Sequence, residues 1–185
     1  HDIAMLGDID TNALTVLECE CQHDITLNYG GVDFNFTYIA DRIDRIPDPK
    51  GSSDGILRIV DYKTGKDTTS FKCVDDLFAV TSKDKNLRGI LQLMLYCNAY
   101  ALEKKIPDTS IMPVIYKRRD ISETGVIFNG SQLPDYHIIN EVFKTKMDEI
   151  IGNLFNAEIP FQPSSDDNSC RFCRYIDFCR RNAQG

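Results

Sequence analysis

The sequence predicts an α/β fold in which a mixed β-sheet is flanked by helices and followed by a small cysteine-containing unit. Alternating and β-branched residues dominate the first third of the chain, two segments with apolar residues at helical spacing follow, and three of the seven cysteines lie near the C-terminus. We expect residues 1–160 to form the core and residues 161–185 to form a tail that packs on it.

The strands of the sheet are expected mainly before residue 65. Residues 13–46 are typical of two or three antiparallel strands, interrupted by the turn signal Gly30-Gly31. Residues 47–55 are rich in turn formers and should close a hairpin with residues 56–64, which read as a strand again. Because the apolar residues of this last strand are nearly continuous, we expect it in the centre of the sheet.

The second half of the chain supplies the helices. Residues 66–85 are polar and weakly periodic, which indicates irregular structure with room for a short helix. Residues 86–105 and 136–156 are expected to be long helices, the first of them clearly amphipathic. Between them, residues 111–119 form an expected strand whose Pro113 indicates an edge or an irregularity, and which ends in the basic cluster Lys117 to Arg119.

Composition narrows the class of protein. A net charge of -7 argues against a general binder of polyanions, so any contact with nucleic acid should be local. No apolar stretch is long enough to span a bilayer, and the first residues do not resemble a secretory signal, so we expect no membrane partner. An odd number of cysteines without a signal favours the reducing cytoplasm and a metal or cluster site. The chain begins without Met, and we expect it to be a fragment.

The segment "IVDYKTGK" places an acid and a base two residues apart on an expected strand. Asp61 and Lys63 should therefore share one face while Tyr62 points away, which suits either a surface ion pair or half of an active site. Asp41 on the preceding strand could complete a pair of carboxylates for Mg²⁺, as phosphodiester cleavage needs. Asp44 could serve instead, but we prefer it as an ion-pair partner of Arg42 or Arg45.

Other polar residues receive simpler interpretations. Gln92 and Tyr96 are four residues apart and share one face of the expected helix, although Tyr96 could equally be a core residue. His23 and His137 have no partner motif and are expected to be structural. Glu20 is not expected to reach the metal.

In their order along the chain, "YIADRIDRI", "LRIVDYKTGK" and the Q-x-x-x-Y pattern of "QLMLY" resemble motifs of the RecB-like nucleases of the PD-(D/E)xK superfamily. The resemblance covers about residues 14–181 and is greatest to the C-terminal nuclease domains of AddB-type helicase-nuclease subunits. One departure is Tyr38, which stands where glycine is common in that family.

The resemblance implies a restriction-endonuclease-like core and a DNA exonuclease that depends on Mg²⁺ or Mn²⁺. Asp41, Asp61 and the backbone carbonyl of Tyr62 would bind the metal, and Lys63 would be the catalytic base or activator. It also implies DNA as substrate, a helicase subunit or helicase domain as partner, and a role in recombinational repair. The further residues expected at the active site and against DNA are Gln92 and Tyr96, with Lys63 also in contact with DNA. The alternative is a non-catalytic DNA-end-binding or scaffold module, against which the intact acidic and basic residues argue.

The tail carries Cys170, Cys173 and Cys179, which are three ligands where a closed site needs four. The resemblance implies a [4Fe-4S] cluster whose fourth cysteine lies upstream of this chain, with Cys19 or Cys21 as other candidates. Zinc, or cysteines without a ligand, are the alternatives. The arginines of the tail form a basic patch, and we expect Arg171 and Arg174 to contact DNA.

Overall fold

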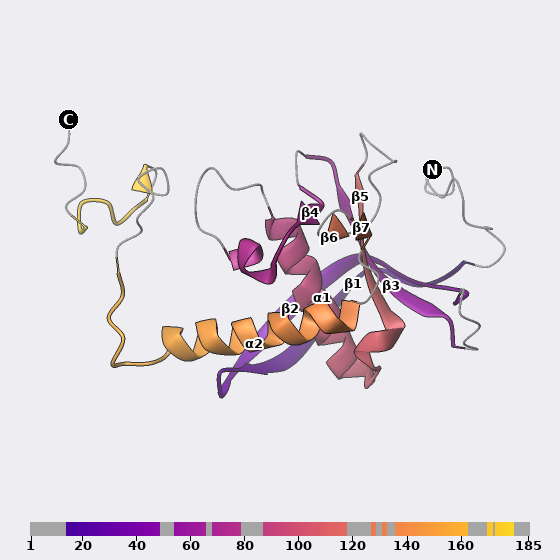
Figure 1. Ribbon diagram of the computed structural model, residues 1–185, viewed down its shortest axis with the longest axis horizontal. Helices are drawn as coiled ribbons and strands as arrows, with labels where there is room; N and C mark the ends of the chain where they lie inside the picture. The colour runs from indigo at the N-terminus through magenta and orange to yellow at the C-terminus, as the bar shows by residue number, and fades with distance from the viewer. Residues whose placement is uncertain are drawn as a thin grey trace.

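The computed structural model describes residues 14–48, 54–65, 68–78, 87–117, 127–128, 131–132, 136–162, 170–171 and 173–179. Its main sheet has the strand order β1-β2-β3-β5 (Figure 1). These strands span Thr15–Tyr29, Val32–Ile46, Ile56–Lys63 and Ile111–Lys117. β2 is antiparallel to both β1 and β3, whereas β3 and β5 are parallel. The predicted mixed sheet flanked by helices is therefore confirmed, with β3 internal and the proline-containing β5 at an edge.

The long hairpin of β1 and β2 turns at the predicted position. Gly30 and Gly31 have φ values of 58° and 74°, the positive values that a two-residue hairpin turn needs at both central positions. Gly30 also lies against the second long helix, where a Cβ would come within 2.4 Å of the Gly152 nitrogen. Its N–H donates to Asp148 at 2.9 Å. The turn therefore requires glycine both for its backbone and for its packing.

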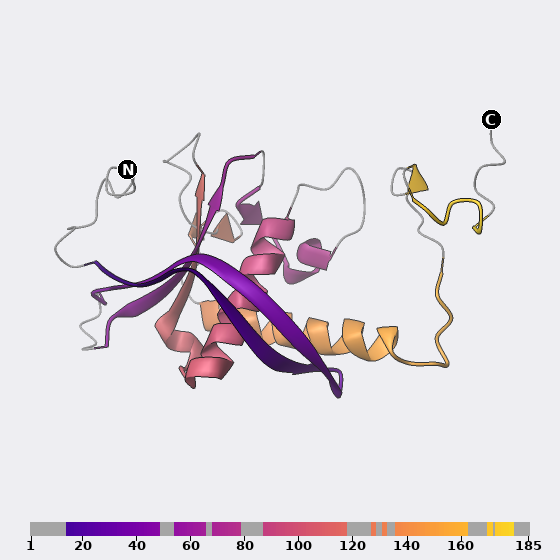
Figure 2. The same cartoon turned by 180° about the vertical axis from the view of Figure 1, so that it is seen from behind.

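Two long helices cover one face of the sheet, as the opposite views in Figures 1 and 2 show. Helix α1 (Arg88–Lys104) connects the parallel strands β3 and β5, a connection that parallel strands require. Helix α2 (Tyr136–Leu154) contacts it through hydrogen bonds between Asn98 of α1 and Asn140 of α2. The main core lies between this layer and the sheet, where Ile59, Ile90 and Met94 are fully buried. Neither described helix combines the length and apolar character that crossing a bilayer requires.

Short elements fill the segment between β3 and α1. β4 (Ser70–Phe71) and the 3-10 helix η3 (Val74–Phe78) agree with the prediction of irregular structure with a short helix. β4 pairs with β6 (Ile127–Phe128), which pairs with β7 (Ser131–Gln132), and η4 (Asp108–Ser110) precedes β5. Two residues of the predicted basic cluster, Arg118 and Arg119, lie outside the described residues.

The opposite face of the sheet carries a buried charge cluster. Asp44, which is 0 % exposed, accepts two hydrogen bonds from Arg58, at 2.6 and 2.8 Å. Its Oδ2 also lies 2.8 Å from the Arg42 Nε. Burial alone would lower the pKa of Arg58, but the hydrogen bonds and charge of Asp44 outweigh it and raise that pKa. The expectation that Asp44 is an ion-pair partner of Arg42 or Arg45 agrees with this geometry for Arg42, and Arg58 is a further partner that was not expected.

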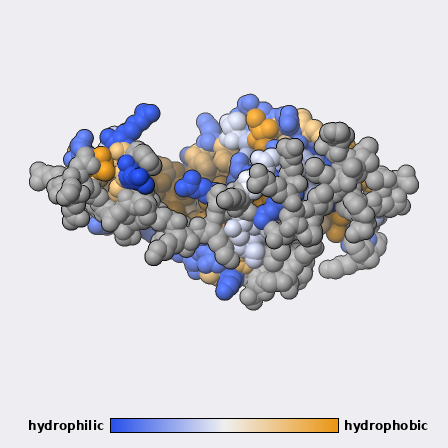
Figure 3. Space-filling view, turned by 90° about the horizontal axis from the view of Figure 1, so that it is seen from above, coloured by the Kyte–Doolittle hydropathy of each residue, from blue (hydrophilic) through white to orange (hydrophobic). Residues whose placement is uncertain are grey.

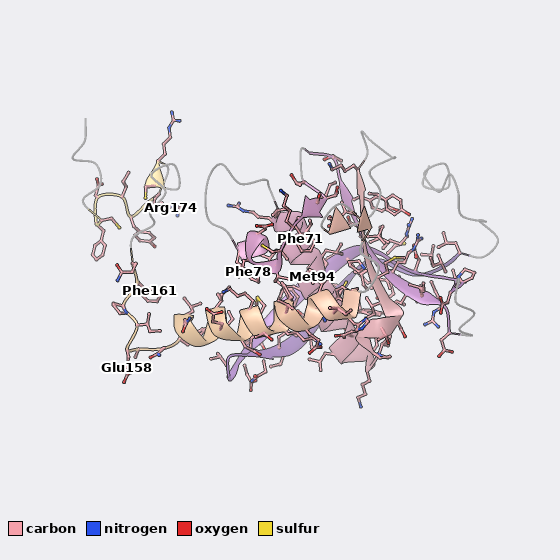
Figure 4. The ribbon with its side chains drawn as sticks, in the orientation of Figure 1. Phe71, Phe78, Met94, Glu158, Phe161 and Arg174 are labelled. Atoms are coloured by element: carbon pink, nitrogen blue, oxygen red, sulfur yellow. The ribbon has the colours of Figure 1, made fainter. Side chains whose placement is uncertain are left out.

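The tail lies beyond the C-terminal end of α2. Figure 4 shows Phe161 and Arg174 there, well separated from Phe71 and Met94 of the core. Figure 3 shows hydrophobic (orange) residues among the hydrophilic ones at this end of the molecule. The exposed aromatic residues of this end are Phe155, Phe161, Tyr175 and Phe178. The boundary at residue 160 and the packing of the tail on the core stay predictions.

Candidate active site

Two carboxylates come together where β2 and β3 separate. The pairing of β2 with β3 ends at Arg42 and Val60, so Asp41 and Asp61 are the next residues opposite each other. Opposed residues of antiparallel strands project to the same face. Beyond this point the backbone N–H of Tyr62 donates to the Asp41 Oδ2 at 2.6 Å. A carboxylate oxygen thus accepts the hydrogen bond that, in a regular sheet, a backbone carbonyl of the neighbouring strand would accept.

The backbone is irregular at this point of the sheet. In β2 the residues that face the core are Tyr38 and Ala40 before Asp41 in the sequence, and Ile43 after it. The even-numbered positions therefore face the core before Asp41 and an odd-numbered one after it, so the alternation of faces shifts by one residue. Glu20, which lies in β1 between the partners of Ala40 and Arg42, has a φ of 49°, in the left-handed region. Irregularities of this kind redirect side chains and are common beside functional sites. Here the shift places Arg42 and Asp44 on one face and Ile43 on the other.

Lys63 reaches back over the carboxylates. Its Nζ lies 2.8 Å from the Asp61 Oδ2 and donates to the Gln92 Oε1 at 3.3 Å. The Lys63 side chain is 20 % exposed and that of Asp61 is 9 % exposed, so the pair lies at the edge of the core rather than free in solvent. Tyr62 points to the other face, where Arg42 donates to its hydroxyl. The expected sharing of one face by Asp61 and Lys63 is confirmed.

Helix α1 supplies the second wall of the site. Gln92 bonds Lys63 through its carbonyl oxygen and donates to the Tyr96 hydroxyl through its amide nitrogen. Burial is the main cause that raises the pKa of Tyr96, with Asp61 raising it further. The Tyr96 hydroxyl therefore stays protonated and neutral near pH 7. Asp61, Lys63, Gln92 and Tyr96 thus form one connected polar row across the sheet and α1.

Tyr38 packs behind this row. Its ring centroid lies 5.2 Å from that of Tyr96 and 4.9 Å from that of His23. His23 lies between two carboxylates, with its ring nitrogens 2.7 Å from Glu18 and 3.0 Å from Glu103. The predicted structural role of His23 agrees with this setting. A tyrosine at position 38 fills space against α1 that a glycine would leave empty.

Several predicted residues are not brought to this site. Arg171 and Arg174 lie in the tail, and Figure 4 shows Arg174 well separated from the sheet. Cys170 and Cys173 are half-buried and Cys179 is exposed, while Cys19 and Cys21 are exposed on β1. Within the described part of the chain, no three His, Cys, Asp or Glu side chains gather closely enough to hold a metal ion. The tail cysteines therefore do not form a ligand set in this arrangement.

One residue of the site was missed by sequence reasoning. Gly89, in the first turn of α1, lies against the Lys63 side chain, where a Cβ would be 2.9 Å from Lys63 Cε. The available signal was a glycine inside an amphipathic helix, which lowers helix stability and needs a reason.

The donor set at Asp41 and Asp61 fits a hard divalent cation. Mg²⁺ is usually bound by oxygen ligands that include one or two carboxylates. Two opposed carboxylates and the nearby carbonyl of Tyr62 are oxygen donors of that kind, with no thiolate or imidazole among them. The residues present thus suit Mg²⁺ or Mn²⁺ rather than a softer metal.

A pair of carboxylates beside a lysine, at the ends of two neighbouring strands, is the arrangement expected of a phosphodiester-cleaving domain. The family comparison agrees with it: the model of the PD-(D/E)XK nuclease superfamily matches residues 8–180, and the chain belongs to this superfamily. No curated protein matches the chain. Among solved structures it is similar to the crystal structure of SSO0001, with 17% identity and a TM-score of 0.38 over 96% of this chain and 67% of that one.

Proposed function

We propose that this chain is a Mg²⁺-dependent DNA exonuclease domain, with Asp41, Asp61 and Lys63 at its catalytic centre. The observation that supports the proposal best is the convergence of the two carboxylates and the Lys63 ammonium on one face of the sheet, next to Gln92 of α1. Membership of the nuclease superfamily makes DNA the expected substrate. The exonuclease mode and the choice of metal come from the motif resemblance.

In the proposed reaction, water attacks the phosphorus and loses a proton as a new P–O bond forms. The bond to the leaving oxygen breaks and that oxygen takes up a proton, so that H and OH of one water molecule are added across the phosphodiester bond. A bound divalent ion supplies Lewis-acid chemistry, which polarises a phosphate oxygen and lowers the pKa of water. Asp41, Asp61 and the Tyr62 carbonyl would hold that ion. These residues are fixed in place by the sheet before substrate arrives, which is what electrostatic catalysis requires.

Lys63 acts as a charged donor in this proposal. Its Nζ contacts two oxygen acceptors, Asp61 and Gln92, as expected of an ammonium group rather than a base. From that position it orients the attacking water and offsets negative charge that develops on the phosphate. Gln92 holds the lysine, and the neutral Tyr96 hydroxyl holds Gln92.

The deciding experiment measures cleavage of end-labelled single- and double-stranded DNA during titration with Mg²⁺ and Mn²⁺. Asp61→Ala and Lys63→Ala should each reduce the rate at least about 10²-fold while the protein stays folded. Thr64→Ala is a matched control, because Thr64 is an exposed residue just after β3 and takes no part in the proposed site. Binding of DNA ends without metal-dependent cutting would favour the non-catalytic scaffold instead. Near-normal cutting by Lys63→Ala would place the catalytic centre elsewhere.

Metal binding can be measured without cutting. Soaking crystals with Mn²⁺ should place an ion between Asp41 and Asp61, and Asp41→Asn should abolish that site. An ion bound at any other place on the sheet would contradict the assignment.

We propose further that Cys170, Cys173 and Cys179 ligate a [4Fe-4S] cluster in a longer protein that supplies a fourth cysteine. The C-x2-C-x5-C spacing supports this, as does the N–H of Tyr175, which donates to the Cys173 sulfur at 3.4 Å. Iron and sulfide analysis of a longer protein should find both elements, and Cys173→Ser should remove them. Stoichiometric zinc would overturn the assignment.

The biological setting we propose is cytoplasmic recombinational repair, with a helicase subunit or helicase domain as partner and Arg171 and Arg174 as contacts to DNA. The motif resemblance supports this setting. ATP-dependent processing of a DNA end by the longer protein should stop at unwinding when Asp61→Ala is introduced. Unchanged degradation of the end would assign the nuclease role to a different domain.

A further inference from the structure

We propose that Gly89 is a positioning residue for Lys63. Because glycine has no side chain, it leaves a slot through which the lysine reaches Asp61 and Gln92. The inference rests on the proposed function of Lys63. It adds a residue that acts through the position of Lys63 and that sequence motifs do not mark.

The geometry of the slot is specific. Gly89 is buried in the first turn of α1, against Lys63 at the end of β3. A Cβ at this position would lie 2.9 Å from Cε, 3.8 Å from Nζ and 3.9 Å from Cδ of Lys63. Carbon atoms in ordinary contact are about 3.5–4.0 Å apart. The end of the lysine side chain therefore occupies the volume that a methyl group would take.

The backbone does not explain this glycine. Gly30, Gly31 and Gly55 have positive φ values, but Gly89 has the ordinary conformation of a right-handed helix, which alanine also adopts. Alanine in a helix is more stable than glycine, because glycine loses more conformational freedom on folding. Gly89 thus lowers the stability of the helix, but it leaves the space in which the Lys63 side chain lies.

A methyl group at position 89 would displace the Lys63 ammonium. Moving Cε to ordinary contact distance requires a shift of about 0.5–1 Å, and that shift acts on the contacts of Nζ with Asp61 and Gln92. The lysine can move because its end is flexible, so the fold should tolerate the change. Catalytic geometry is far less tolerant, since a misplacement of about 1 Å can cost about 10²-fold in rate.

The test compares two glycine substitutions with the same backbone effect. Gly89→Ala should lower kcat about 10–100-fold with KM within about twofold, because the binding of DNA away from Lys63 is unchanged. Gly152→Ala, near the end of α2, is the matched control: its Cβ would lie 3.7 Å from Gly30 Cα, an ordinary contact, and its kcat should stay normal. Equal kcat in wild type and Gly89→Ala would overturn the inference.

A second measurement needs no activity. Each glycine-to-alanine change should raise Tm by about 1–4 °C from helix propensity alone. For Gly89→Ala this gain should be smaller in the wild-type background than in Lys63→Ala, where nothing fills the slot, whereas Gly152→Ala should give the same gain in both backgrounds. Equal gains for Gly89→Ala in both backgrounds would also overturn the inference. If the wild-type protein failed to cut DNA, the proposed function would fail, and the Tm comparison would still test the slot.

Discussion

Asp44 and Asp61 are buried aspartates on neighbouring strands, and we predict that the same substitution lowers stability at the first position and DNA cleavage at the second. Asp44→Asn removes the negative charge that contacts two buried arginines, Arg42 and Arg58, which are 6% and 3% exposed. Breaking a buried ion pair in this way costs about 3–5 kcal/mol, because the partner charge stays buried. Tm shifts by about 2–4 °C per kcal/mol in a protein of this size, so Tm should fall by about 6–20 °C.

Asp61→Asn should behave differently. Its partner Lys63 is partly exposed and flexible, and can turn toward solvent when the carboxylate is neutralised. We therefore expect Tm to change by no more than about 2 °C, while DNA cleavage falls at least about 10²-fold. Thermal unfolding followed by circular dichroism, together with a cleavage assay below the Tm of both variants, measures the two effects.

The result that would refute this reasoning is a reversal of the pattern. If Asp44→Asn kept its Tm but lost metal-dependent cutting, Asp44 would be the functional carboxylate and its ion pairs would be incidental. If Asp61→Asn lost as much stability as Asp44→Asn, the ion pair of Asp61 with Lys63 would be a structural contact rather than part of an active site.

Three further predictions concern the hairpin turn and two buried side chains of the core. Gly30→Ala should lower the free energy of unfolding, measured with urea, by about 2 kcal/mol or more. The substitution forces a positive φ on alanine and brings its Cβ within 2.4 Å of backbone atoms. An unchanged unfolding midpoint would mean that the turn can move away from α2. Burial raises the pKa of Tyr29 to about 12, so the stability that its protonated hydroxyl contributes is fully present below about pH 10 and is lost as pH rises toward 12. Thermal melts over a pH series should show a smaller fall of Tm at alkaline pH for Tyr29→Phe than for the wild type. An equal effect of Tyr175→Phe, at an exposed site, would contradict the assignment. Burial raises the pKa of the Cys97 thiol, so iodoacetamide at pH 8 should modify the exposed Cys19 and leave Cys97 unmodified. Mass spectrometry measures the two modifications. Rapid labelling of Cys97 would mean that the core opens readily.

Much of the fold could be predicted from local patterns. Side-chain alternation marked β1 and β2, and a nearly continuous apolar run marked β3. Helical spacing marked α1 and α2, and two successive glycines marked the turn of the hairpin. These features depend on neighbours close in sequence, so a single chain contains the information for them. The sharing of one face by Asp61 and Lys63 is of the same kind, because residues i and i+2 of a strand always point the same way.

The sequence by itself also determined which chemistry to look for, since two acids and a lysine in strand context suit a metal-dependent nuclease, and the superfamily match agrees. Only the tertiary structure decided which aspartate of β2 is structural, because the second partner of Asp44 comes from β3 and the faces of β2 shift beside Asp41. It likewise decided the place of Gly89, whose importance depends on a lysine 26 residues earlier that meets it only when α1 packs on the sheet. Contacts between residues distant in sequence depend on packing geometry, and no local periodicity encodes that geometry.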